Sequence, residues 1–469
     1  MERNLILLVI VSILIKLSFF LFTEHDLDEY TNGFFNTLGQ NFAEVLEFCS
    51  FKEYGNLTYY ASKRTNFPVI LLELISGICS SINSRFGLIL PFIIINFIHF
   101  LQGILIYSYL IKCYPILSAL SKTMIEKKYY QMSVNFLLGL FWINPISIYY
   151  GSLLSFGIEL ELLFQLLLLW ISVDSTRKYR ALLPIICGLN VYYSPNISIS
   201  LIPSALSLFL LGNNHYLKLQ VSPKQFDNYK MYFTKFWDNF QSDYLTSKQI
   251  FKTISFFTSF LITFLSLHIF SLILINNRND NNHIFTFKQY IYTYIIQNFT
   301  LLENKDLNPY LNVYWFLMYC IAPEFRLFFQ IILGSCLIIY AFIINISLGK
   351  VPFKALQSQL LLCFIFKSNP TFLNYLLIFF FILFDSVTLF ESKSGFIASF
   401  SFIFWIICIP LAFLIRPIWI LENSLDSNLY YSLTLIGNFS IIIFICEWIK
   451  SLFNTLVKYN QNLDNIKQE

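Results

Sequence analysis

The chain has 469 residues, a formal net charge of +4, and a composition that is 57% hydrophobic and only 12% charged. Soluble domains carry about 25% charged residues, so these charges are too few for the solvent-exposed surface of a water-soluble protein of this length. Disorder is excluded too, because it requires low hydrophobicity and high charge. The composition therefore predicts an all-α, polytopic membrane protein, and the small net charge gives no argument for nucleic-acid binding.

Apolar runs recur from the first residues to the last fifty. The run at 4–22 lacks a basic leader region and a small-residue cleavage site, so we interpret it as a retained span in which Lys16 snorkels toward the headgroups. Prolines at positions 184, 195, 203, 370 and 410 predict breaks in the helices. Because a spanning helix needs about 20 apolar residues, we predict about twelve spans, at 4–22, 87–111, 131–150, 157–173, 181–194, 197–212, 252–276, 327–348, 356–367, 371–390, 396–420 and 431–453.

The distribution of Lys and Arg in the loops fixes the predicted topology. All basic loops lie on the cytosolic side if the apolar stretch 67–82 lies in the interface instead of crossing the membrane. Both termini are then cytosolic, and the sequons at Asn56 and Asn298 face the lumen. We expect one membrane domain, 1–469, with a luminal loop at 23–86 holding an interfacial helix, a cytosolic loop at 213–251, a luminal loop at 277–326 with a second interfacial helix, and a cytosolic tail at 454–469.

The sequence contains no recognisable nucleophile motif. Nine cysteines occur without a CxxC pair, mostly in apolar runs, so we expect buried thiols, and five histidines show no metal-ligand spacing. No GxSxG or P-loop occurs. No metal or other cofactor is expected.

Acidic residues follow the first predicted span: Glu24, Asp26, Asp28 and Glu29. In a polytopic glycosyltransferase that uses lipid-phosphate sugars, carboxylates at this place supply a general base or hold a metal. We favour the alternative, a solvated acidic loop, because no second acidic partner with matching placement is obvious. Four carboxylates also lie within predicted spans, where ionisable groups are functional candidates: Glu159, Glu161, Asp385 and Glu447.

Polar residues gather near the predicted luminal ends of several spans. They include Asn144-Pro145, the segment 366–371, Arg416-Pro417, the segment 426–431, and Asn438. Such groups are costly in lipid, so together they predict a cavity for a phosphate- and sugar-bearing lipid headgroup. The alternative is that each one caps a helix or bonds a neighbouring backbone group.

The C-terminal third resembles a known family. The segment 307–316 (LNPYLNVYWF), the segment 366–371 (FKSNPT), the segment 427–431 (SNLYY) with Asn438, and the earlier Asn144-Pro145 are similar, in this order, to motifs of PIG-U. PIG-U is the polytopic subunit of the glycosylphosphatidylinositol (GPI) transamidase complex of the endoplasmic reticulum.

The resemblance implies a fold like that of the polytopic (GT-C type) glycosyltransferases and a non-catalytic subunit that binds the GPI lipid. Its implied partners in the endoplasmic reticulum membrane are a cysteine-peptidase-like catalytic subunit, PIG-T, PIG-S and a metallopeptidase-like subunit. The expected GPI-binding residues are Asn438, Ser427, Asn428, Lys367, Ser368 and Tyr431. The alternative is a dolichyl-phosphate-mannose-dependent GPI mannosyltransferase that uses Asp26 or Asp28 as its base. A transporter is less favoured, because no internal repeat is seen.

Overall fold

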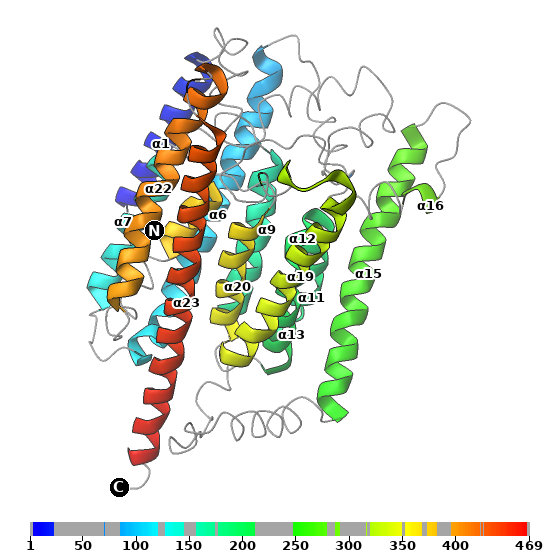
Figure 1. The fold of residues 1–469 in the computed structure, drawn as a ribbon. Helices are drawn as coiled ribbons and strands as arrows, with labels where there is room; N and C mark the ends of the chain where they lie inside the picture. The colour runs from blue at the N-terminus through cyan, green and yellow to red at the C-terminus, as the bar shows by residue number, and fades with distance from the viewer. Residues whose placement is uncertain are drawn as a thin grey trace.

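The computed structural model describes residues 3–22, 70, 85–120, 127–144, 156–173, 177–211, 247–278, 287–290, 316, 319–348, 352–367, 373–381, 395–422, 424 and 426–466. All regular structure within these ranges is helical, which confirms the predicted all-α class (Figure 1). The acidic residues at 24–29, Asp385, Ser368, both sequons and most of the predicted interfacial helices lie outside the described residues.

The helices follow the predicted spans closely. Their bounds are α1 (Arg3–Phe22), α6 (Arg85–Leu120), α7 (Lys127–Ile143), α9 (Phe156–Val173), α10 (Arg177–Arg180), α11 (Leu183–Tyr193), α12 (Pro195–Ser198), the 3₁₀ turn η3 (Ile199–Leu201), α13 (Ile202–Leu211), α15 (Ser247–Arg278), α16 (Phe287–Tyr290), α19 (Pro323–Leu348), α20 (Pro352–Phe366), α22 (Gly395–Glu422) and α23 (Ser427–Ile466). Residues 373–381 are also helical.

Four helical stretches in the described part are long and apolar enough to cross a membrane: Phe92–Cys113, Gln249–Asn277, Gly395–Arg416 and Ser427–Leu452. Shorter apolar helices accompany them, among them Leu183–Tyr193 and Pro352–Phe366. This pattern supports a membrane protein in which short helices are covered by long ones.

Two local predictions are wrong. Pro410 does not break a helix, because α22 continues through it from Gly395 to Glu422. Pro410 is exposed, and α22 is held by its packing along α23 on another face. The second is the end of α6, which continues to Leu120 instead of ending near residue 111. The segment 454–466, within the predicted tail, is helical and continues α23.

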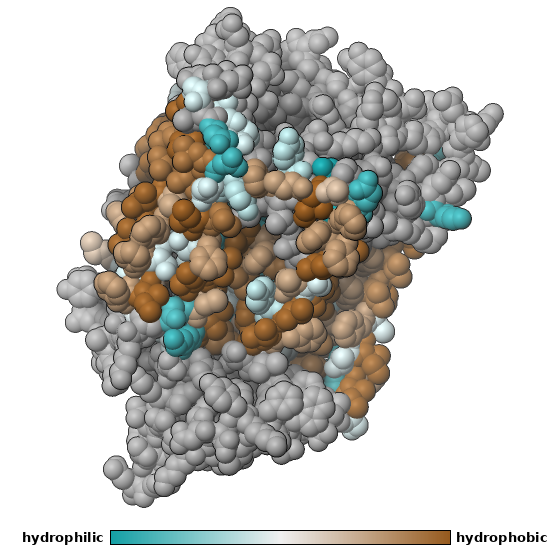
Figure 2. Space-filling view, in the orientation of Figure 1, coloured by the Kyte–Doolittle hydropathy of each residue, from teal (hydrophilic) through white to brown (hydrophobic). Residues whose placement is uncertain are grey.

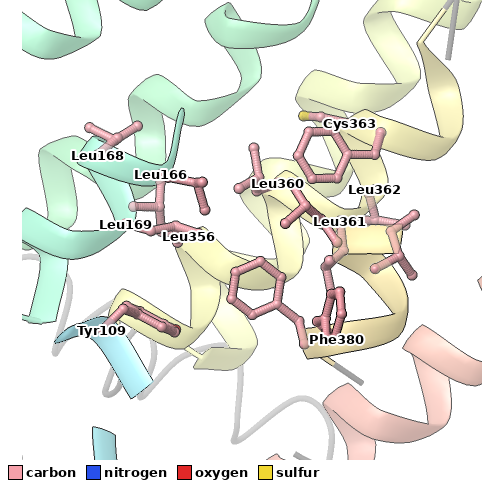
Figure 3. Close-up of a cluster of buried hydrophobic side chains, with 14 of the residues drawn as sticks. Tyr109, Leu166, Leu168, Leu169, Leu356, Leu360, Leu361, Leu362, Cys363 and Phe380 are labelled. Carbon is pink, nitrogen blue, oxygen red and sulfur yellow. The ribbon is translucent and has the colours of Figure 1, made fainter. Parts of the chain in front are cut away.

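A buried helix, α20, forms the centre of the bundle. Every residue from Pro352 to Ile365 is buried, and α20 packs against α9, α13, α19 and α23. Figure 3 shows leucines of α9, such as Leu166, beside leucines of α20, such as Leu356 and Leu360. Because α20 is enclosed by other helices, fifteen residues suffice for it inside the membrane.

The outer helices present apolar side chains to their surroundings. α15 stands at one side of the bundle in Figure 1 and packs on α11 and α13, with residues such as Phe251 and Ile262 exposed. Figure 2 shows hydrophobic side chains across the middle of the face made by α19, α22 and α23. An exposed apolar belt of this kind is what lipid tails require.

The end of the bundle at the top of Figure 1, where α1 ends and α6 and α23 begin, is the end that the loop charges predict to face the lumen. Following that prediction, we call it the luminal end.

Candidate functional site

The luminal start of α23 is capped by Asp426. Its Oδ1 accepts a hydrogen bond from the backbone N–H of Asn428 at 3.1 Å, and its Oδ2 accepts one from the Asn428 side chain at 3.1 Å. Ser427 donates to Oδ1 at 3.3 Å. The bonds from Asn428, the backbone one first, hold the pKa of the Asp426 carboxyl below its usual value. Two predicted site residues, Ser427 and Asn428, thus lie at the helix start with Asn428 exposed.

Lys367, a third predicted site residue, follows the end of α20. Its Nζ donates to Oε2 of Glu161 on α9 at 2.6 Å, and both side chains are 12% exposed. The other carboxylate oxygen of Glu161 accepts a hydrogen bond from Gln165 at 3.1 Å. The structure therefore connects Lys367 to a carboxylate far away in the sequence, and it places the pair near the surface without fully exposing it.

Tyr431 lies one turn inside α23 and stacks on Phe316, with ring centroids 3.9 Å apart. The preceding residue, Tyr430, is buried and stacks on Trp419 of α22 at 5.7 Å. Aromatic contacts thus connect the start of α23 to α22 and to the segment before α19.

Asn438 is buried between α23 and the helical segment 373–381. Its amide oxygen accepts a hydrogen bond from the Tyr375 hydroxyl at 3.0 Å, and its amide nitrogen donates to the Thr434 carbonyl at 2.8 Å. Asn438 lies about 15 Å farther along α23 than Asn428, which is half the thickness of a bilayer core. The structure thus separates Asn438 from the two residues at the helix start.

Two contacts give the relative direction of α20 and α23. Lys354, early in α20, has its Nζ 5.8 Å from the ring centroid of Trp448, near the middle of α23, whereas Tyr375, soon after the end of α20, bonds Asn438, which precedes Trp448. The two helices thus run in opposite directions (Figure 1). Lys367 lies about 20 Å along α20 from Lys354 and Asn428 about 30 Å along α23 from Trp448, which puts Lys367 about 10 Å deeper than Asn428.

A second polar cluster is fully buried between α1, α6 and α9. Gln102 donates to the Glu159 carboxylate at 2.6 Å, and Nδ1 of His99 lies 3.5 Å from the same carboxylate oxygen. Lys16 is buried as well and interacts electrostatically with Glu159. The prediction that Lys16 snorkels is wrong, because its side chain is buried inside the protein, where Glu159 influences its charge.

Within the described part of the chain, no group of three or more His, Cys, Asp or Glu side chains is arranged to hold a metal ion. Four of the described cysteines are buried as expected, Cys113, Cys187, Cys363 and Cys408, whereas Cys320 and Cys446 are exposed. Cys363 lies 3.0 Å from the Ser200 hydroxyl.

Sequence reasoning named Glu159 and Glu161 as candidates but named no partner for either. It missed Gln102, His99 and Gln165 altogether. The available signal was that all three are polar residues within apolar runs, where polar groups face protein or a cavity.

Comparison with known protein families decides the assignment of the chain. The sequence model described as GPI transamidase subunit PIG-U matches residues 10–437, nearly the whole chain. The chain belongs to the PIG-U family. It is a subunit of the GPI transamidase, as the motifs in the C-terminal third predicted, and as such it is associated with the membrane and with other subunits of that complex. The match does not favour the mannosyltransferase alternative. A search of curated proteins finds no match.

Proposed function

We propose that this chain is a non-catalytic, multi-pass subunit in the endoplasmic reticulum membrane that holds the GPI lipid for the transamidase. In this proposal the luminal ends of α20 and α23 bind the phosphate- and sugar-bearing headgroup. A cysteine-peptidase-like subunit performs the transfer, and PIG-T, PIG-S and metallopeptidase-like subunits are the further partners.

One observation carries the proposal. Polar groups suited to a headgroup lie at the same end of two antiparallel, packed helices: Lys367 at the end of α20, and Ser427 with Asn428 at the start of α23. Their levels differ by about 10 Å, as estimated from the helix rise. A glycan with attached phosphates extends over such a distance, whereas a single small ion does not.

The proposed contacts differ in kind. Lys367 supplies a cation to a phosphate oxygen, and Asn428 supplies an amide to sugar hydroxyls. Tyr431, stacked on Phe316, supplies an aromatic face. Ser368 follows Lys367 in the sequence and belongs to the same proposed set.

Asn438 takes a supporting part in this account. Both ends of its amide are bonded to neighbouring groups, so it holds Tyr375 and the segment 373–381 against α23. Direct contact between Asn438 and the headgroup stays a prediction. The exposed apolar side chains of α19 and α22, such as Phe328 and Phe400, are the proposed seat of the acyl chains.

The test replaces Lys367 by Gln and Asn428 by Ala in cells that lack the endogenous subunit. We expect less GPI-anchored reporter at the cell surface, with complete GPI lipid and unprocessed precursor protein accumulating. Lys450→Gln is the matched control, because Lys450 is exposed near the other end of the apolar stretch Ser427–Leu452 and its ion pair within the described residues is with Glu447, at 3.3 Å.

Normal anchoring in both variants would contradict the proposed contacts. An accumulation of under-mannosylated GPI intermediates would instead indicate a transferase and overturn the non-catalytic assignment.

A further inference from the structure

The first turns of α9 carry two carboxylates that bind neighbours on different sides. Glu159 contacts Gln102 and His99 of α6, whereas Glu161 contacts Lys367 after α20. Residues two apart on a helix point about 200° apart, so the two side chains leave α9 in nearly opposite directions. The luminal half of α9 is thus tied to the N-terminal helices by one carboxylate and to α20 by the other.

The Glu161 carboxylate has a fixed orientation. One oxygen accepts from Lys367 at 2.6 Å, and the other accepts from Gln165, one turn along the same helix, at 3.1 Å. Gln165 is itself buried. Because both oxygens are bonded, the direction in which Glu161 presents its charge to Lys367 is set by α9 and not by solvent.

Glu159 is bonded through both its backbone and its side chain. Gln102 donates to both its backbone carbonyl, at 2.7 Å, and its carboxylate, at 2.6 Å. His99 stacks on Phe141 of α7 at 4.7 Å, which brings a further helix into contact with the cluster. A buried ion cluster of this kind fixes the relative register of the helices that contribute to it.

We propose that Glu161 is a positioning residue for the GPI headgroup site: it holds the Lys367 ammonium in place at the luminal end of α20, while Glu159 anchors α9 so that Glu161 stays in register. The proposal rests on the proposed function, in which Lys367 contacts a headgroup phosphate. A lysine side chain is long and flexible, and fixing it before the ligand arrives lowers the entropy lost on binding.

The first experiment compares Glu161→Gln with Lys367→Gln in the intact complex purified from cells. Two quantities are measured: the amount of subunit in the complex, and the GPI lipid that co-purifies with it. Both variants are expected to lose several-fold in retained GPI lipid at near-normal subunit abundance. Glu447→Gln is the matched control, a carboxylate near the other end of the apolar stretch Ser427–Leu452 whose partner Lys450 is exposed, and it is expected to retain the lipid.

The second experiment exchanges the charges in a double variant, Glu161→Lys with Lys367→Glu. The ion pair is restored, so the subunit is expected to assemble normally, but the cation now lies on α9 and lipid retention is expected to stay low. Full recovery of lipid retention would show that the pair is merely structural and would overturn the proposal. Should Glu161→Gln fail to assemble, Glu161→Asp keeps the charge but withdraws it from the Lys367 ammonium, and full lipid retention in that variant would overturn the positioning role.

The outcomes distinguish the positioning role of Glu161 from the proposed headgroup contact of Lys367. If Lys367→Gln loses the lipid while Glu161→Gln retains it, the positioning role is wrong and the proposed function stands. If Lys367→Gln itself retains the lipid, the proposed headgroup contact is wrong, and the positioning role falls with it.

Discussion

Asp426 illustrates how a single side chain orders the proposed site. It lies at the N-cap of α23, where backbone N–H groups have no partner within the helix, and it accepts the N–H of Asn428 at 3.1 Å. The same carboxylate bonds the side chains of Ser427 and Asn428. The cap therefore fixes Ser427 and Asn428, two of the residues that we assign to the headgroup.

The cap predicts a pH dependence. The pKa of Asp426 is lower in the folded protein than its unfolded value of about 3.9, so the ionised cap stabilises the fold above that value. This contribution is lost as the pH falls through the lower, folded pKa. We expect Asp426→Ala to unfold at a lower temperature than the wild type at pH 7, and the difference to shrink toward pH 3.

Thermal unfolding of the purified complex between pH 7 and pH 3 measures this difference. Asp426→Asn, which keeps an acceptor at the cap, serves as the control, and its unfolding temperature should lie between those of the wild type and Asp426→Ala. A gap between wild type and Asp426→Ala that is the same at every pH would show that the charge has no part in the cap.

Lys16 gives a second prediction at the scale of the residue. Lys16 is buried and interacts electrostatically with Glu159, so removing its charge leaves the buried carboxylate less compensated. We therefore expect Lys16→Met to lower the subunit's abundance strongly, and the double variant with Glu159→Gln to recover part of it. Immunoblotting of membrane fractions measures both.

Lys450→Met is the control for Lys16→Met, because Lys450 is exposed. If Lys16→Met and Lys450→Met were equally abundant, Lys16 would not stabilise the bundle through Glu159.

The sequence predicted which residues are unusual better than it predicted what they do. Glu159, Glu161 and Lys367 stand out as charges in or beside apolar runs, and all three form polar contacts. Their partners were not predictable, because Glu161 and Lys367 meet across 206 positions of the sequence. Lys16 was wrongly assigned to the interface for the same reason, since nothing local to it reveals Glu159.

At the scale of the helices, glycines mark the places of closest approach. A Cβ atom added at Gly103 of α6 would lie 2.5 Å from the indole ring of Trp142 in α7, and that indole is buried and cannot move aside easily. At Gly437 of α23, an added Cβ would lie 2.9 Å from Ile409 of α22. Small residues at such contacts allow membrane helices to pack closely.

Gly103→Val is therefore expected to separate α6 from α7 and to lower the thermal stability of the complex. Overpacking of a well-packed interior costs about 1–3 kcal/mol, which is a large part of a typical net stability. Phe97→Val on the same helix is the control, because Phe97 is exposed. Equal unfolding temperatures for the two variants would contradict the close contact between α6 and Trp142.

Helix positions were predictable to within a few residues in most cases, because hydropathy reports directly on membrane length. Pro195 and Pro203 do lie at or next to the starts of α12 and α13. Pro410, which is exposed, does not end α22, because the helix is held by its packing along α23, a tertiary feature that the local sequence does not contain. The central, enclosed position of α20 was likewise not predictable beyond its short length.

For the whole molecule, apolar side chains lie around the middle of the bundle and the polar groups of the proposed site lie toward one end. Exposed apolar side chains surround the bundle, while the described groups that we assign to the headgroup lie toward the luminal ends of α20 and α23. The family was readable from motifs in the sequence and is confirmed by the match over residues 10–437. The antiparallel packing that brings Lys367 and Asn428 to one end required the structure.

The most direct test of lipid holding is photo-crosslinking in the assembled complex with a GPI analogue that carries a photoreactive group on its glycan. Mass spectrometry then maps the attached peptides. We predict cross-links to the segments around Lys367 and Asn428, lost in the Lys367→Gln and Asn428→Ala double variant. Cross-links confined to other subunits, or to the opposite end of this bundle, would contradict the account.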